Sequence, residues 1–133
     1  MKKTYHESGT RKRAIARATL SEGSGIIKIN NILLDNFEPE LARMKIREPL
    51  LLAESLAGKV DISVRINGGG YMSQAEAARL AIARVLLSYS KGDSLKNIFL
   101  KYDRHLIVAD VRRKEMYKPN DSKARAKRQK SYR

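Results

Sequence analysis

Hydrophobic and polar residues alternate most regularly between residues 60 and 66. Val60, Ile62, Val64 and Ile66 are separated by single polar residues, and this period of two predicts a β-strand with one apolar face and one hydrated face. Because only one face is apolar, helices are expected to cover that face alone.

The covering helix is predicted soon after this strand. Ser73 and Glu76 form a capping-box pattern, in which the two side chains satisfy backbone N–H groups at the start of a helix. Apolar residues then recur at helical spacing, namely Ala78, Ile82, Val85, Leu86 and Tyr89. Both signals predict one long amphipathic helix.

Shorter elements complete the predicted order. Residues 13–20 and 26–30 are expected to form two strands joined by a short glycine-containing turn. Pro39 suits the first turn of a helix, which Pro49 should interrupt, so that residues 50–56 resume it at a different angle. A further helix is expected with Asp93 or Ser94 as its cap. The fold class predicted is α+β.

Positive charge dominates the chain, which has 28 lysines and arginines against 14 acidic residues. Residues 112–133 alone hold ten of these cations and two acids. Such a segment has few apolar side chains to offset its ordering entropy, so it is expected to be disordered until a polyanion binds it. We therefore predict a globular domain over residues 1–111 and an extended basic tail over residues 112–133.

Nucleic acid is the polyanion that this charge favours. An anionic membrane surface is disfavoured, because the tail lacks an apolar helical stripe and no segment approaches the roughly 20 apolar residues of a membrane span. No apolar stretch of signal-peptide length follows the basic N-terminus, so a cytoplasmic protein is expected. The absence of cysteine excludes disulfides and cysteine-based metal sites, and no metal or cofactor is expected.

Gly68, Gly69 and Gly70 lie between the predicted strand and helix, where backbone N–H groups can hold a phosphate. Nucleotide chemistry is disfavoured, because the run fits neither GxxxxGK[ST] nor GxGxxG with its later acidic residue. A tight turn that needs positive φ is favoured. Close passage of an RNA backbone is compatible with that turn.

Basic residues gather around the first predicted strand. Arg11, Arg13 and Arg17 would share one face of an extended strand, with Lys12 beside them. Three guanidinium groups at this spacing can straddle phosphates, and a solvated sheet face is the alternative. RNA contact is favoured because the cations are dense.

The histidines lack the companions that catalysis requires. His105 lies in the sequence Asp-Arg-His-Leu, but no serine nucleophile elbow, HExxH motif or second positioned carboxylate accompanies it. Asp103 and Asp110 are expected to pair with Arg104, Arg112 or Arg113. The sequence therefore predicts neither an enzyme nor a small-molecule substrate.

The basic tail has the length and chemistry to enter a large RNA assembly. Fully extended, its residues reach roughly 70 Å. Tyr132 offers a ring that can stack on a base, and Arg133 carries a guanidinium at the tip. A solvated charged helix or a nuclear-import signal is the alternative.

Several motifs occur together along almost the whole chain: GTRKRAIARATL, NGGG before the helix SQAEAARLAIARVLL, YDRHLIVADVRR, and the terminal QKSYR. In this order they resemble small-subunit ribosomal protein nine, and the YDR and QKSYR segments resemble its archaeal and eukaryotic cytosolic branch. Ser73 stands where the family usually has glycine, and Val111 where this branch commonly has proline.

The resemblance implies a fold like the second domain of small-subunit ribosomal protein five. That fold is a two-layer sandwich of a mainly antiparallel four-stranded sheet, with helices on one face and a left-handed crossover. The one-sided alternation of residues 60–66 agrees with it.

The resemblance also implies a structural role in the head of the small ribosomal subunit, bound to the 3′ major domain of small-subunit ribosomal RNA and to neighbouring proteins. The tail would extend toward the peptidyl-site transfer RNA, with Lys130, Tyr132 and Arg133 nearest to it. The residues expected to bind ribosomal RNA are Arg11, Lys12, Arg13, Arg17, Arg112, Arg113, Lys114, Lys123, Arg125, Lys127 and Arg128.

Two other function classes stay open at this point. A family of small-molecule kinases uses the same fold, but the serine-rich phosphate loop and nearby catalytic Asp or Lys that mark those enzymes are absent from the sequence. A free-standing RNA chaperone or DNA-coating protein is disfavoured only by the resemblance.

Overall fold

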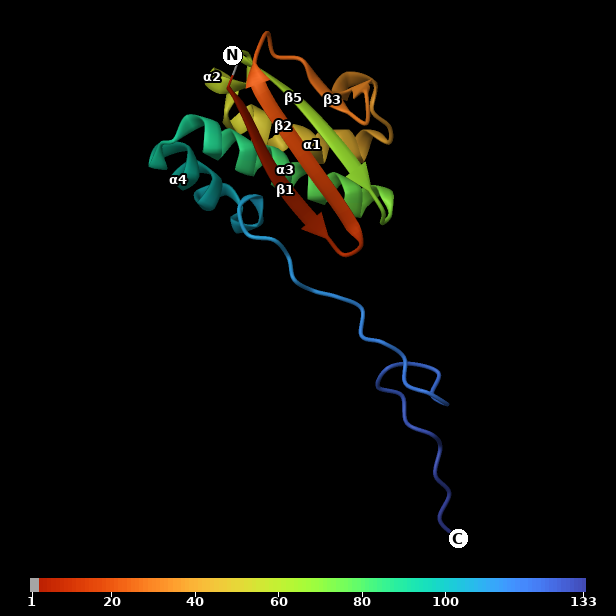
Figure 1. Cartoon of the computed structure of the whole chain (residues 1–133). Coiled ribbons are helices and arrows are strands. Elements are labelled where there is room, and N and C mark those ends of the chain that lie inside the picture. Colours follow the sequence, from red (N-terminus) through yellow and green to blue (C-terminus); the bar gives the residue numbers. More distant parts are fainter. Residues whose placement is uncertain (1–2) are drawn as a thin grey trace.

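The computed structural model describes residues 3–133. Within this range, one mixed sheet contains β1 (Thr4–Arg11), β2 (Ala14–Glu22), β3 (Ile27–Ile29), β4 (Ile32–Leu33) and β5 (Val60–Asn67). The helices are α1 (Glu40–Leu52), α2 (Glu54–Ala57), α3 (Tyr71–Ser90) and α4 (Asp93–Tyr102), with the 3₁₀ helices η1 (Leu34–Asn36) and η2 (Arg104–Leu106). Figure 1 shows the long helices on one face of the sheet, which confirms the α+β prediction.

The sheet has more strands than the four expected, and its strand order differs from the predicted hairpin. Five strands run in the order β1-β2-β5-β3-β4 across the described residues. β2 pairs antiparallel with both β1 and β5, whereas β3 runs parallel to β5 on its other side. The predicted pairing of residues 13–20 with residues 26–30 is therefore wrong, because β5 separates them. The left-handed crossover and the relation to ribosomal protein five stay predictions.

The strand predicted over residues 60–66 is confirmed as β5. Val60, Ile62, Val64 and Ile66 are buried, whereas Arg65 on the opposite face is exposed. Burial of an aliphatic side chain of this size contributes roughly 1.5–3 kcal/mol. A slip of one residue would turn all four side chains to solvent, so this burial fixes the register of β5.

The long helix predicted after β5 is confirmed as α3, but its start is not a capping box. α3 begins at Tyr71 with Gly70 at its cap position, and no side chain forms a cap hydrogen bond there. Ser73 lies inside the first turn, because the glycine turn lets the helix begin earlier than predicted. The side-chain amide of Gln74 instead donates to the carbonyl O of Gly68 at 3.1 Å.

Pro39 and Pro49 have different effects on α1. Pro39 occupies the cap position of α1, close to its predicted place, but Pro49 does not interrupt the helix. α1 continues through a buried Pro49 to Leu52, and the break falls at Ala53, before α2. The predicted final helix is present as α4, with Gly92 at its cap instead of Asp93 or Ser94.

Arg79 of α3 forms ion pairs with α1 and with the junction between α4 and η2. Its side chain is 7% exposed, and its Nη2 lies 2.5 Å from Oε2 of Glu48 on α1 and 2.9 Å from Oδ2 of Asp103. Burial acts to raise the pKa of Asp103, but hydrogen bonds from the His105 backbone N–H and from Arg79 outweigh it and hold that pKa below its usual value. Asp103 therefore pairs with Arg79, not with its neighbour Arg104.

α3 packs closely across β1 and β2 through small residues. Ala16, Ala18, Ala77 and Ala81 are almost completely buried. At Gly9 of β1, an added Cβ would lie 2.7 Å from the backbone N of Ala81 and closer still to the carbonyl O of Ala77. Because both neighbours are backbone atoms, only glycine fits this position.

Gly9→Ala should therefore destabilise the protein by about 2–3 kcal/mol, because overpacking forces β1 and α3 apart. Gly58→Ala is the matched control, since an added Cβ there meets no atom within 4 Å, and its stability should change by less than about 1 kcal/mol. Urea unfolding measures both. Equal stability of the two variants would show that α3 does not depend on Gly9.

Candidate nucleic-acid interface

Three segments that are distant in the sequence meet around a hollow of about 860 Å³. They are the β1–β2 turn, the start of α3 and the segment after Asp110. The hollow is lined by Arg11, Lys12, Arg13, Gly69, Gly70, Ser73, Arg112, Arg113 and Lys114, and no acidic residue of the described chain lines it. We call this site the basic hollow. It brings together six of the predicted RNA-binding residues.

The β1–β2 turn presents two cations. Lys12 adopts a positive φ of 52° between the strands, and the side chains of Lys12 and Arg13 are exposed. Within residues 3–133 neither side chain forms a hydrogen bond or ion pair. The prediction that Arg11, Arg13 and Arg17 share one strand face is wrong, because Arg11 ends β1, Arg13 lies in the turn and Arg17 lies in β2.

The glycine run forms the predicted tight turn. Gly68 and Gly69 have positive φ values of 74° and 71°. An added Cβ on Gly69 would lie 2.9 Å from the Cβ of Ala14, so the turn packs directly on the start of β2. This contact places the N-terminus of α3, which has no acidic residue in its first turn, beside the cations of the hollow. The positive end of the helix dipole adds to their potential.

Arg11 differs from its neighbours because it is held inside the protein. Its side chain is 12% exposed, its Nε lies 2.5 Å from Oε2 of Glu76, and its Nη1 lies 3.3 Å from Oδ2 of Asp110. Arg11 therefore joins the end of β1 to α3 and to the segment that leads into the tail. This arrangement assigns it a structural part in the hollow.

Asp110 fixes the start of the tail. Hydrogen bonds from the side chain and backbone N–H of Arg112 hold the pKa of Asp110 well below its usual range, and the charge of Arg11 assists. The same pairing raises the pKa of Arg112. The predicted partnership of Asp110 with Arg112 is confirmed.

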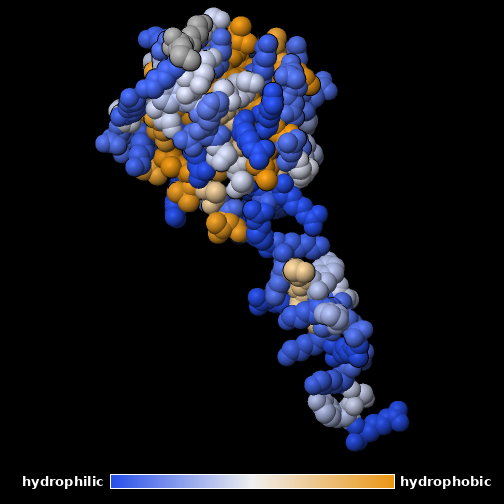
Figure 2. Space-filling model, in the orientation of Figure 1, coloured by the Kyte–Doolittle hydropathy of each residue, from blue (hydrophilic) through white to orange (hydrophobic). Residues whose placement is uncertain are grey.

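Beyond this anchor the chain leaves the body. Residues 107–133 contain no helix or strand, and Figures 1 and 2 show them leading away as a hydrophilic extension. Arg125 pairs with Glu115 at 2.8 Å, Arg128 donates to the carbonyl O of Asn120 at 3.4 Å, and the Lys114 ammonium lies 4.6 Å from the ring centroid of Tyr117. The other cations of residues 113–133 form no side-chain contact of this kind within the described chain, namely Arg113, Lys118, Lys123, Lys127, Lys130 and Arg133.

Besides the tail cations, Tyr132 and Arg17 also lie away from the hollow. Tyr132 is 88% exposed at the end of the tail. Arg17 projects from the face of the sheet that the helices leave open, where it lies opposite Arg65. Sequence reasoning missed Arg65, although the polar phase of the alternation in residues 60–66 marks it as a residue of that face.

Other kinds of site find no support in the described residues. Between residues 3 and 133, no group of three or more His, Asp or Glu side chains is arranged to hold a metal ion. None of the helices in that range combines the length and apolar character needed to cross a bilayer. His105 is exposed, and its imidazole Nδ1 lies 3.4 Å from the carbonyl O of Val108.

Comparison with protein families decides which of the function classes applies. A family model described as ribosomal protein S9/S16 matches residues 9–133. The chain belongs to this family. The resemblance drawn from the sequence motifs is confirmed, and the S9 family is one of structural ribosomal proteins and not of enzymes.

Archaeal members of the S9 family align over nearly the full length. Small ribosomal subunit protein uS9 of Methanothrix thermoacetophila is 49% identical over 98% of this chain and 99% of its own. The protein of the same name from Methanococcus vannielii is 47% identical over 98% and 99%, respectively. That from Desulfurococcus amylolyticus is 51% identical over 95% and 90%.

The two arginines at the β1–β2 turn should respond differently to mutation. Arg11→Gln should lower stability by about 1–2 kcal/mol, because Glu76 and Asp110 lose their shared partner in a partly buried place. Arg13→Gln removes the same charge from an exposed position without a partner and should change stability by less than about 0.5 kcal/mol. Denaturant unfolding at neutral pH compares them. An equal effect at both positions would contradict the structural assignment of Arg11.

Proposed function

We propose that this protein is a structural constituent of the small ribosomal subunit that binds small-subunit ribosomal RNA through the basic hollow. The observation that carries the proposal is the convergence of unpaired cations from separate segments on one hollow, in a member of the S9 family. The curated relatives are named as small ribosomal subunit proteins, which supports the assignment to that subunit. The 3′ major domain in the subunit head is the proposed RNA partner.

The hollow suits phosphate groups better than base edges. Lys12, Arg13 and Arg113 carry unpaired charge, and the backbone at Gly69 and Gly70 leaves room for a phosphate to approach. Contacts of this kind position a protein on folded RNA and carry no sequence information. Each neutralised phosphate should contribute about −0.7 to −0.9 to the log–log slope of affinity against salt.

The tail is proposed to work as a separate unit over residues 112–133. It buries little apolar surface, so RNA contacts must offset the entropy of ordering it. Lys123, Arg125, Lys127 and Arg128 would follow the ribosomal RNA, while the tip would extend toward the peptidyl-site transfer RNA. Neighbouring head proteins are further proposed partners, and the protein would act ribosome-bound in the cytoplasm.

The contribution of the hollow can be tested with the combined variant Lys12→Gln, Arg13→Gln and Arg113→Gln. Its affinity for a transcribed 3′ major domain should fall by about tenfold or more, and its salt slope should fall by about 2–3, because three phosphate contacts are lost. Filter binding at several salt concentrations measures both quantities.

The control for this experiment removes the same charge elsewhere. Lys59, Lys96 and Lys101 are exposed and lie outside the hollow, so changing all three to Gln should affect binding less. Equal losses in the two combined variants would show that RNA responds to net charge alone and not to the hollow.

The tip of the tail should contribute to transfer RNA binding and not to assembly. Deleting residues 130–133 should leave incorporation into small subunits intact while weakening peptidyl-site transfer RNA binding by about 5-fold to 30-fold, because about 1–2 kcal/mol of phosphate contact is lost. Sedimentation measures incorporation, and filter binding to reconstituted subunits measures transfer RNA. The charge-preserving pair Lys130→Arg and Arg133→Lys is the control, and failed assembly of the truncated chain would refute the division.

A further inference from the structure

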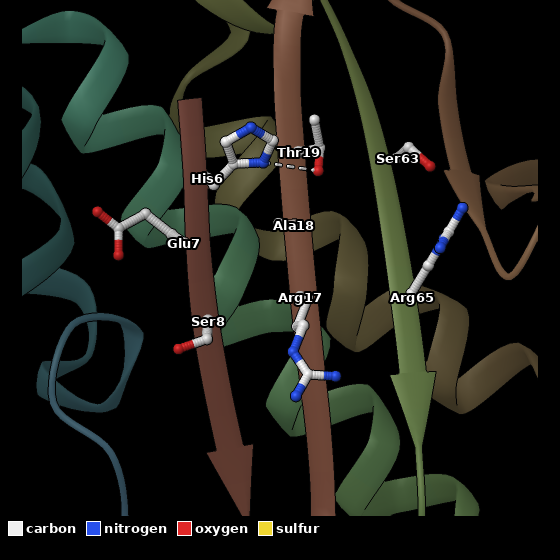
Figure 3. Close-up of a pocket in the computed structure, with 8 residues that line it drawn as sticks. All are labelled: His6, Glu7, Ser8, Arg17, Ala18, Thr19, Ser63 and Arg65. Carbon is white, nitrogen blue, oxygen red and sulfur yellow. Dashed lines mark hydrogen bonds between the residues drawn. The ribbon is translucent and has the colours of Figure 1, made fainter. Parts of the chain in front are cut away.

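The face of the sheet opposite the helices holds a second polar hollow, of about 690 Å³. Figure 3 shows that three adjacent strands contribute to it. We call its outward-facing residues the open sheet face: His6, Ser8, Arg17, Thr19, Ser63 and Arg65. Strand register aligns them in two rows, Ser8 with Arg17 and Arg65, and His6 with Thr19 and Ser63.

Arg17 and Arg65 form an uncompensated pair of like charges. They are directly opposite in the antiparallel β2–β5 pair, where Cβ atoms are separated by about 4.5–5.5 Å and like charges destabilise a sheet. Neither side chain forms a hydrogen bond or ion pair with any residue from 3 to 133. In Figure 3 the two guanidinium groups extend toward opposite ends of the strands. The charge of both arginines is therefore uncompensated by the described residues and available to an external anion.

The nearby carboxylates do not neutralise these two arginines. Glu7 also lines the hollow, but its Oε1 accepts a hydrogen bond from Oγ of Ser88 on α3 at 2.7 Å, which directs its carboxylate toward the helical side of β1. Asp61 lies at the end of β5 away from Arg65, and its Oδ1 accepts the backbone N–H groups of Ser24 and Ile26. The centre of the open sheet face therefore presents cations and hydroxyl groups.

We propose that the open sheet face binds the sugar–phosphate backbone of RNA as a second surface, additional to the basic hollow. Arg17 and Arg65 neutralise phosphates, and the hydroxyls of Thr19 and Ser63 bond phosphate oxygens or ribose 2′-OH groups. Nδ1 of His6 lies 3.0 Å from Oγ1 of Thr19, which orients both side chains.

This surface recognises the backbone and not the bases. RNA-binding sheets that read single-stranded bases stack them on aromatic rings, and no Phe, Tyr or Trp of the described chain lines this hollow. Arg17 lies four residues along the chain from Arg13, roughly 13 Å in an extended strand. One folded RNA can therefore contact both the basic hollow and the open sheet face, so this inference rests on the proposed function.

Arg65→Gln in the full-length protein tests the inference. The probes are a mixed-sequence 20-base-pair RNA duplex and a 20-residue polyglutamate peptide, each titrated by fluorescence anisotropy at several salt concentrations. For the RNA, affinity should fall about 3-fold to 5-fold and the salt slope by about 0.7–0.9, as for one lost phosphate contact. The thermal unfolding midpoint should not fall, because a like-charge pair is removed.

Arg104→Gln is the charge-matched control. Arg104 is exposed on η2 and has no side-chain partner within residues 3–133, and its loss should reduce RNA affinity less than 2-fold.

Equal effects of the two variants on RNA would overturn the inference while leaving the proposed function intact. A larger loss for polyglutamate than for RNA would also overturn it, in favour of an acidic protein partner. If the unmodified chain bound neither the duplex nor small-subunit ribosomal RNA, that result would contradict both the proposed function and this inference.

Discussion

Close packing of α3 against the first two strands is the constraint on which the rest of the structure depends. Gly9, Ala16 and Ala18 on the sheet and Ala77 and Ala81 on the helix are small buried residues, and the backbones at Gly9, Ala77 and Ala81 approach closely. Dispersion contacts at this density are sensitive to a single added methyl group. The packing fixes where α3 begins, and therefore places the glycine turn beside the β1–β2 turn. The basic hollow is a consequence of how the core packs.

The structure divides its arginines into two groups. Arg79 is buried and Arg11 is partly buried, and both pair with carboxylates from other elements and stabilise the fold. Arg13, Arg17 and Arg65 have no partner within residues 3–133 and leave their charge for an external anion. The sequence identifies cations but not this division, because the partners of Arg11 lie far along the chain, on α3 and before the tail. The fold and the proposed binding surface thus use the same residue type for different purposes.

Sequence predicted the elements whose buried positions carry large apolar side chains. β5 and α3 were predicted because aliphatic residues recur at periods of two and 3.6. β1 was not predicted, because Gly9 is its one fully buried residue and glycine gives no hydrophobic signal. The pairing of residues 13–20 with residues 26–30 was predicted wrongly. The true partner of β2 is β5, which is distant in the sequence, as the pair Ile15 and Asn67 shows. Such a pairing depends on the whole fold and leaves no local signal.

The anchored start of the tail bears on how a segment without a core would bind RNA in the proposed function. Arg11 and Arg112, which both line the basic hollow, hold Asp110, and Figure 1 shows the C-terminal segment leading away from the body. In the proposed function, RNA bound in the hollow would therefore meet the tail as a tethered partner at high effective concentration. The body has already lost its translational and rotational freedom on binding, so each further tail contact must offset only the local entropy of ordering. Individually weak phosphate contacts can then order the tail residue by residue from its anchored end.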